Sequence, residues 1–165
     1  MSDAFKLRDA VAADVAQIVR FIRNLAQYEK LEDQVEVTEQ LLADAMFGPR
    51  ANLFGMIADV AGVAAGYALY FYNFSSFVGR RGLYLEDLYV DPGHRRHGLG
   101  KAMFQALARR AVDEGCGRFE WAVLNWNAPA LKFYKSIGAV PLSEWQTQRL
   151  AGEALHKLAN TAGAQ

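Results

Sequence analysis

The sequence predicts an α/β (α+β) fold, a single domain over residues 1–165 with a mixed, mostly antiparallel central sheet flanked by helices. Three observations predict it. Strand-like apolar runs follow one another from residue 52 to residue 90 with only turns between them. Strand-like and helical runs then alternate from residue 83 to residue 138. The chain has 165 residues, 52% hydrophobic and 22% charged, which is typical of one globular domain.

The first third of the chain is predicted to form a strand and two helices. Asp14 is placed to cap the first helix or to favour its N-terminus, and Thr38 is placed to cap the second. Gly48-Pro49 stops the second helix. The acidic segment 29–39 between the helices is either a solvated face or a surface that meets a cation. The three predicted elements cover residues 5–11, 13–30 and 38–47.

The remainder of the chain is predicted to add most of the sheet and three helices. Ala61-Gly62 turns the chain between two strands, while Gly115 and Gly138 each end a helix. The expected strands are 52–60, 64–74, 83–90 and 118–124, with a closing pair at 139–142 and 146–150. The expected helices are 99–114, 127–137 and 153–158.

The most informative stretch runs from Leu83 to Lys101 and joins a strand, a basic glycine-containing loop and the start of a helix. Unpaired N–H groups and the dipole at a helix N-terminus attract anions, and glycines let a phosphate approach the backbone. Arg95 and Arg96 add positive charge. The spacing predicts a phosphate-binding loop, and the alternative is an ordinary turn with exposed arginines. The sequence fits neither a P-loop nor a dinucleotide fingerprint.

Composition argues against several classes of function. Eighteen basic and eighteen acidic residues cancel, which argues against nucleic acid as the main partner. Cys116 is the only cysteine, so we expect no internal disulfide and a reducing, cytoplasmic location. No apolar run approaches ~18 residues, so we expect no membrane insertion. The histidines show no metal-ligand spacing, so we expect no metal; they are His94, His97 and His156.

Two motifs together indicate a family. The first is Arg-x-x-Gly-x-Gly at residues 95–100, and the second is Asn-x-x-Ala-x-x-x-Tyr-x-x-x-Gly-Ala at residues 127–139. They resemble motifs of the GNAT superfamily of acetyl-CoA-dependent N-acetyltransferases. Within it the chain is most similar to the spermidine/spermine, or diamine, acetyltransferases, through residues 25–29, 71–72, 83–87, 126–127 and 133–135.

Two departures from the family pattern stand out. The family loop often has Gly at the position of Arg96. The polyamine enzymes carry an acidic residue and a tryptophan at the positions of Gln146 and Gln148. The second departure concerns the choice of amine, namely whether polyamines are accepted, rather than the transfer of the acetyl group.

The resemblance implies acetyl-CoA as cosubstrate, bound in a cleft where strand 83–90 splays from strand 118–124. The pantetheine arm then pairs with free backbone groups near Leu88 and Val90, and the Leu88 N–H stabilises the oxyanion. The implied coenzyme-binding residues are Leu88, Tyr89, Val90, Arg95, Arg96, His97, Gly98, Leu99, Gly100, Lys101, Asn127, Ala130 and Tyr134.

The resemblance also implies direct attack by a bound amine, without a covalent enzyme intermediate. Tyr134 matches the family's general acid; the alternative is a packed aromatic residue. Glu86 is the candidate base because it lies on the strand that borders the cleft. Strand alternation places Glu86 and Asp87 on opposite faces, and Asp87 is alternatively a polar residue that caps a turn. The implied substrate-binding residues are Tyr28, Glu29, Glu86, Asp87 and Trp126, although Trp126 alternatively packs.

A small cationic amine is the expected acceptor, because acidic residues gather in the segment 29–39 and on the cleft strand. The alternatives are a peptide or protein amine as acceptor and a non-catalytic acetyl-CoA-binding module. A homodimer is expected from the resemblance and from an aromatic run that is unusually apolar for a surface strand. That run comprises Tyr67, Tyr70, Phe71, Tyr72, Phe74 and Phe77.

Overall fold

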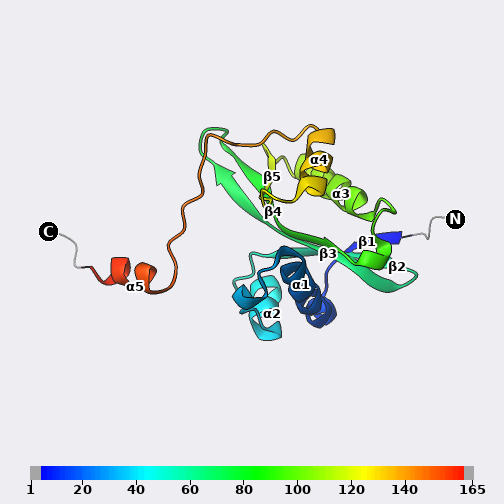
Figure 1. The fold of residues 1–165 in the computed structure, drawn as a ribbon, viewed down its shortest axis with the longest axis horizontal. Helices are drawn as coiled ribbons and strands as arrows, with labels where there is room; N and C mark the ends of the chain where they lie inside the picture. Colours follow the sequence, from blue (N-terminus) through cyan, green and yellow to red (C-terminus); the bar gives the residue numbers. More distant parts are fainter. Residues whose placement is uncertain (1–4, 162–165) are drawn as a thin grey trace. The chain divides into compact units, whose positions relative to one another are not determined.

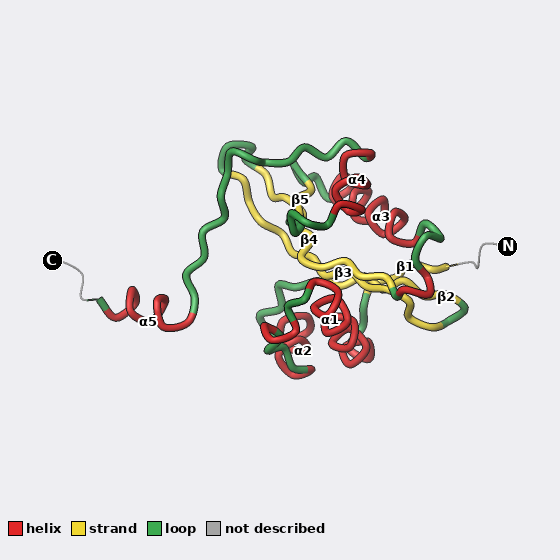
Figure 2. The backbone as a smooth tube through the Cα atoms, viewed as in Figure 1, coloured by secondary structure: helices red, strands yellow, loops and turns green. Residues whose placement is uncertain are grey.

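The computed structural model describes residues 5–161. The chain divides into two compact units, Met1–Leu124 and Asn125–Gln165. The first unit contains a five-stranded sheet with the strand order β1-β2-β3-β4-β5 (Figures 1 and 2). Neighbouring strands run antiparallel from β1 to β4, and β5 runs parallel to β4. The strands are β1 (Phe5–Asp9), β2 (Phe54–Val60), β3 (Val63–Ser75), β4 (Arg80–Val90) and β5 (Phe119–Trp121).

Helices cover both faces of this sheet, which confirms the predicted fold class. Helices α1 (Val15–Glu29) and α2 (Glu39–Phe47) lie on one face, and α3 (Leu99–Asp113) lies on the other (Figure 1). Short 3₁₀ segments introduce or follow them at Ala12–Asp14, Glu32–Gln34 and Pro92–His94. No helix within residues 5–161 has the length and apolar content needed to cross a bilayer.

Each face has its own core. Under α1 and α2, Phe21 stacks on Tyr67 with ring centroids 5.7 Å apart, and both side chains are fully buried. Under α3, Phe104 meets Trp121 edge-on with centroids 5.0 Å apart. Arg110 fixes the far end of α3 by donating to the Tyr70 hydroxyl and, at 2.6 Å, to Asp9 Oδ1. The two cores sandwich the sheet, so the orientations of β3 and β4 are set by packing on both sides.

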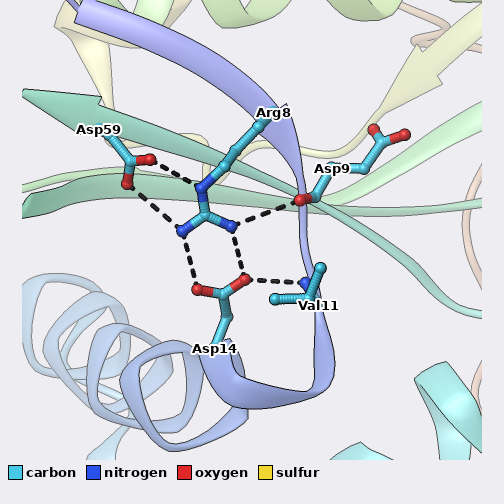
Figure 3. Close-up of polar contacts among 5 residues, drawn as sticks. All are labelled: Arg8, Asp9, Val11, Asp14 and Asp59. Carbon is cyan, nitrogen blue, oxygen red and sulfur yellow. Dashed lines mark hydrogen bonds and ion pairs between the residues drawn. The ribbon is translucent and has the colours of Figure 1, made fainter. Parts of the chain in front are cut away.

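Of the two predicted helix caps at Asp14 and Thr38, the structure contains the one at Thr38 but not the one at Asp14. Thr38 Oγ1 accepts a hydrogen bond from Leu41 N at 3.2 Å, as a capping residue does. Asp14 directly precedes α1, but its carboxylate accepts from Arg8 and from Val11 N instead of from the first turn of α1 (Figure 3). The predicted cap is therefore a strand-to-helix clamp that holds the entry of α1 against β1.

The second unit contains two helices, α4 (Ala128–Ser136) and α5 (Gly152–Asn160). The helix expected at 153–158 is confirmed as part of α5, and Gly138 has φ 83° just beyond α4, as a helix-ending glycine should. The predicted strands at 139–142 and 146–150 are wrong, because both segments are irregular (Figure 2). A strand needs a neighbour for its backbone groups, and these segments are instead largely exposed, with Val140 at 79%.

The strand boundaries also differ from the prediction at β4 and β5. β4 begins at Arg80 rather than at residue 83, and β5 stops at Trp121 rather than at residue 124. The early end of β5 matters for function, because within the described part of the chain it leaves residues 86–90 of β4 without a strand partner on that side.

Candidate active site

The edge of β4 that faces β5 is paired with that strand at only three of its 11 residues. The parallel pairing runs from Leu83–Phe119 to Leu85–Trp121 and stops there, while β4 continues to Val90. The ladder between the two strands therefore ends directly after Leu85, and their divergence beyond that point stays a prediction.

A β-bulge lies at the point where this pairing ends. On the β3 side, Tyr70 pairs with Leu85 and Leu69 pairs with Asp87, so Glu86 is the extra residue. Leu83 N donates to Arg118 O next to β5, whereas Asp91 N donates to Ala65 O next to β3.

The bulge decides which backbone groups face the unpaired edge. Asp91 lies eight positions after Leu83, an even offset, so in a regular strand their N–H groups would face the same edge. The extra residue at Glu86 reverses this alternation. The N–H and C=O groups of Leu88 and Val90 consequently face the edge that β5 leaves open, as predicted for the groups that pair with pantetheine.

Asp87 is a partly buried carboxyl group with a perturbed pKa. Tyr67, which is fully buried, donates its hydroxyl to Asp87 Oδ2 at 3.2 Å. Burial raises the pKa of Asp87 to about 6; the nearby charges of Glu86 and Glu29 also raise it, and the Tyr67 hydrogen bond lowers it. The bulge thus interrupts the alternation that was expected to place the Glu86 and Asp87 side chains on opposite faces of the sheet. The two carboxyl groups interact electrostatically.

Glu29 comes from α1 and adds a third carboxyl group. It is the last residue of the helix, because Lys30 turns the chain with a left-handed φ of 61°. Burial raises the pKa of the Glu29 carboxyl above its usual range. The carbonyl end of the helix dipole adds negative potential at this point. The sequence-predicted residues Glu29, Glu86 and Asp87 are therefore brought together in one negatively charged cluster.

Tyr67 is the residue of this site that sequence reasoning missed as a functional residue. In the sequence Tyr67 is one member of an aromatic run. Its position beside the site follows from the pairing of β3 with β4, in which Tyr67 lies opposite Tyr89. Burial is the first reason that its pKa lies well above the usual value, so Tyr67 stays protonated and donates to Asp87. The available signal was the hydroxyl group of Tyr67, because a buried tyrosine hydroxyl usually finds a hydrogen-bond partner. Tyr67 lies two positions from Leu69, which pairs with Asp87.

The glycine loop leads into α3 with two left-handed residues. Arg96 has φ 67° and Gly98 has φ 80°. The left-handed conformation explains why the family pattern has glycine at the position of Arg96, since a side chain there is strained. A Cβ added to Gly98 would meet no atom within 4 Å, so the backbone is open to a bulky ligand.

The N-terminal turn of α3 packs close to the open edge of β4. A Cβ added to Gly100 would lie 3.9 Å from the side chains of both Leu88 and Val90. The first N–H groups of α3, at Leu99 and Gly100, have no carbonyl one turn earlier in the helix. The loop and the open edge are therefore neighbours, and both fit a ligand that carries phosphates at one end and amides along its length.

Arg95 makes contacts that the motif does not indicate. Its Nε donates to Val90 O at 2.8 Å. Its guanidinium carbon lies 5.2 Å from the ring centroid of Tyr28 and 5.5 Å from that of Tyr89. The role of Arg95 as a coenzyme ligand stays a prediction.

Among the other predicted residues, His97 lies exposed in the loop before α3 and Lys101 lies exposed in α3. Trp126, Asn127, Ala130 and Tyr134 belong to the second unit. Asn127 Oδ1 accepts from Ala130 N at 3.3 Å, so Asn127 caps α4 as expected. Tyr134 lies on α4, with its ring centroid 5.7 Å from that of Phe133. Trp126 is 52% exposed. The coenzyme and catalytic roles of these residues stay predictions, as does the absence of a metal; within residues 5–161 no three potential metal-binding side chains gather.

Comparison with known proteins gives consistent matches. Residues 19–139 match the acetyltransferase (GNAT) family. The thialysine N-epsilon-acetyltransferase of Sus scrofa is 38% identical over 93% of this chain and 96% of that protein. The spermidine/spermine N(1)-acetyltransferase-like protein 1 of Homo sapiens is 32% identical over 95% of this chain and 24% of that protein. An integron cassette protein from V. cholerae superposes with a TM-score of 0.80 at 28% identity, over 98% of this chain and 99% of that one.

These matches confirm the resemblance read from the two motifs. The family match spans most of the first unit and continues through α4, and the thialysine relative covers nearly the whole chain. The chain therefore belongs to the GNAT acetyltransferase family and is an N-acetyltransferase.

Proposed function

We propose that this enzyme acetylates a primary amine of a small cationic acceptor, such as a diamine, a polyamine or a thialysine-like amino acid. The observation that carries the proposal is the cluster of Glu29, Glu86 and Asp87 beside the open edge of β4. Within the described residues none of these three carboxylates forms an ion pair with Lys or Arg, so a bound ammonium group is a suitable partner. The names of the relatives, which refer to thialysine and to spermidine, point the same way.

Acetyl-CoA is the proposed acetyl donor, and its bound thioester supplies the activated acyl group. The open N–H groups at the start of α3 and the positive charge of Arg96 suit its phosphates. The Leu88 N–H faces the open edge and is placed to stabilise an oxyanion. Holding the amine and the thioester side by side favours direct attack in a ternary complex.

The amine must lose a proton before it attacks, since a lysine-like amine has a pKa of about 10.4. We assign proton acceptance to Glu86, the exposed residue of the bulge, either directly or through water. Asp87 and Glu29 bind the cation. Asp87 is the second candidate base, because its pKa of about 6 is closer to neutrality than that of an ordinary carboxyl group.

Tyr134 is the proposed general acid that protonates the leaving thiolate, on the basis of its motif position. Tyr134→Phe keeps the ring and removes the proton, so kcat should fall by roughly 10²–10⁴. Coenzyme affinity, measured by calorimetry, should change little. A kcat within about twofold of wild type would assign the proton to water or to another group.

The central test is thiol release from acetyl-CoA with a panel of acceptors. The panel contains a diamine, a monoamine of equal length, thialysine, a neutral amide and a basic peptide. The diamine or thialysine should exceed the monoamine about tenfold in kcat/KM, because a second ammonium meets a second carboxylate in a half-desolvated site. Equal rates with neutral acceptors would exclude the cationic substrate. A faster peptide would favour a protein acceptor, and calorimetric binding of acetyl-CoA without thiol release would favour a non-catalytic module.

We further propose a homodimer. The aromatic run of β3 and the turn after it divides in the structure, because Tyr67 and Tyr70 fill the cores whereas Phe74 and Phe77 are 67% and 99% exposed. Exposed large apolar groups also occur at Val140 and Trp145 in the second unit. Such surfaces favour association. Light scattering at micromolar concentration tests this, and a mass near the 18.3 kDa of one chain would contradict it.

A further inference from the structure

Arg95 stands between the two halves of the candidate site. On one side its Nε holds the Val90 carbonyl, which faces the open edge of β4. On the other side its guanidinium lies over the ring of Tyr28, in the last turn of α1. Its own element is the loop that precedes α3. One side chain therefore contacts the proposed coenzyme edge and the helix end that carries Glu29.

A planar guanidinium group suits this double contact better than an ammonium group does. It donates through Nε in its plane while its face covers an aromatic ring. The ring of Tyr89 lies 5.5 Å away, so the guanidinium has aromatic neighbours from both α1 and β4. Arg95 is also partly buried, whereas its neighbour Arg96 is exposed. Two adjacent arginines of one loop thus have different surroundings.

We propose that Arg95 is a positioning residue for the amine acceptor, in addition to any contact with phosphate. The inference rests on the proposed function. By holding Tyr28 against β4, Arg95 fixes the C-terminal turn of α1 and keeps the carboxyl group of the next residue, Glu29, near Asp87. Arg96 serves the coenzyme through charge alone.

This arrangement predicts that the two arginines affect different substrates. Loss of the Arg95 contacts frees the end of α1, so the amine loses a binding carboxylate that it contacts in both ground and transition states. Such a loss raises KM for the amine more than it lowers kcat. Loss of Arg96 removes a charge near the phosphates and raises the Kd for acetyl-CoA.

The test compares Arg95→Lys and Arg95→Gln with the matched control Arg96→Gln. The amine KM is measured at saturating acetyl-CoA, and the Kd for acetyl-CoA is measured by calorimetry. Both Arg95 variants should raise the amine KM about three- to tenfold, and lysine should rescue little because it lacks the planar group. Arg96→Gln should raise the acetyl-CoA Kd and leave the amine KM near wild type. An Arg95 variant that changes only the acetyl-CoA Kd would overturn the proposal.

A double-mutant cycle with Tyr28→Leu separates this inference from the proposed function. If Arg95 acts through the Tyr28 ring, Arg95→Lys should have little further effect on the amine KM once the ring is gone, and its effect on denaturant unfolding should also be less than additive. Additive effects in both measurements would overturn the inference. Failure of the proposed function would appear differently, as wild-type protein that releases no thiol with any amine while the unfolding cycle still shows coupling.

Discussion

The two ends of α1 carry carboxyl groups in opposite electrostatic situations. At the start, Asp14 receives two hydrogen bonds from Arg8, at 2.7 and 2.9 Å, and Arg8 Nε also binds Asp59 at 2.7 Å (Figure 3). At the other end, about 20 Å away along the helix axis, Glu29 lies near Asp87. Among the residues that the structure describes, no Lys or Arg forms an ion pair with either carboxylate. Arg8 lowers the pKa of Asp14, whereas burial raises the pKa values of Glu29 and Asp87.

The difference separates a structural site from a functional one. The Arg8 clamp neutralises its carboxylates internally and ties β1, β2 and the entry of α1 together. The acidic cluster holds its carboxylates near one another and at the unfavourable end of a helix dipole. A folded chain keeps such a cluster at a cost in stability, and a cationic ligand offsets that cost. Mutations at the two ends should therefore act on different observables.

The largest effect is expected at Glu86. Glu86→Gln preserves shape and removes the proposed proton acceptor, so kcat should fall by roughly 10²–10⁴ and the pH–rate profile should shift upward. The Kd for acetyl-CoA serves as the control and should stay unchanged. If the profile keeps its position, Asp87 is the next base to test, by Asp87→Asn.

The next largest effect is expected at the clamp. Arg8→Gln leaves Asp14 and Asp59 partly buried without their cation, which should reduce the free energy of unfolding by about 1–3 kcal/mol. Because the lowered pKa of Asp14 contributes stability above its unfolded value of 3.8, wild type should lose this contribution as pH falls below that value. Urea unfolding at pH 7 and pH 3 measures both. If Arg8→Gln loses activity in proportion to its loss of stability, the contrast between a structural site at the start of α1 and a functional site at its end would not hold.

The pH dependence of the acidic cluster should have the opposite sign. Asp87 has a folded pKa of about 6, above its unfolded 3.8, so the folded state binds the proton more tightly. Its contribution to stability should therefore improve as pH falls from about 7 to 4, by about 2 kcal/mol. Asp87→Asn should remove this trend, and the exposed control Asp113→Asn should retain it. Identical pH curves for the two variants would contradict the raised pKa.

The smallest effect on stability is expected at Glu29. Glu29→Gln removes a charge that is unfavourable at the helix C-terminus and should stabilise the fold by about 0.3–1 kcal/mol. It should also raise the amine KM several-fold with kcat nearly intact, because it removes binding common to both states. Glu32→Gln, which alters an exposed acid three residues later, is the matched control. A destabilised Glu29→Gln variant would mean that the carboxylate has a structural partner.

Local patterns in the sequence were sufficient to predict most of the helices and strands and to identify the family. The spacing of Ile18 and Val19 with later apolar residues predicted α1, and the Arg-x-x-Gly-x-Gly motif predicted the loop before α3. These signals lie within a few residues of one another, so helical periodicity and turn chemistry suffice to read them. The acidic residues Glu29, Glu86 and Asp87 were also predicted from the sequence as substrate-binding residues, and that role stays a prediction.

Tertiary structure decided what depends on a distant partner. The strands expected at 139–142 and 146–150 have apolar patterns but no ladder, and the bulge at Glu86 appears only when β4 is aligned with β3. The same holds for the Tyr67–Asp87 hydrogen bond and for the contact of Arg95 with Tyr28, which join segments 20 and 67 residues apart in the chain. A sequence determines which groups are present and how each segment folds locally. The packing of segments that are far apart in the sequence decides which groups become buried together. Burial together is what shifts the pKa values of those groups.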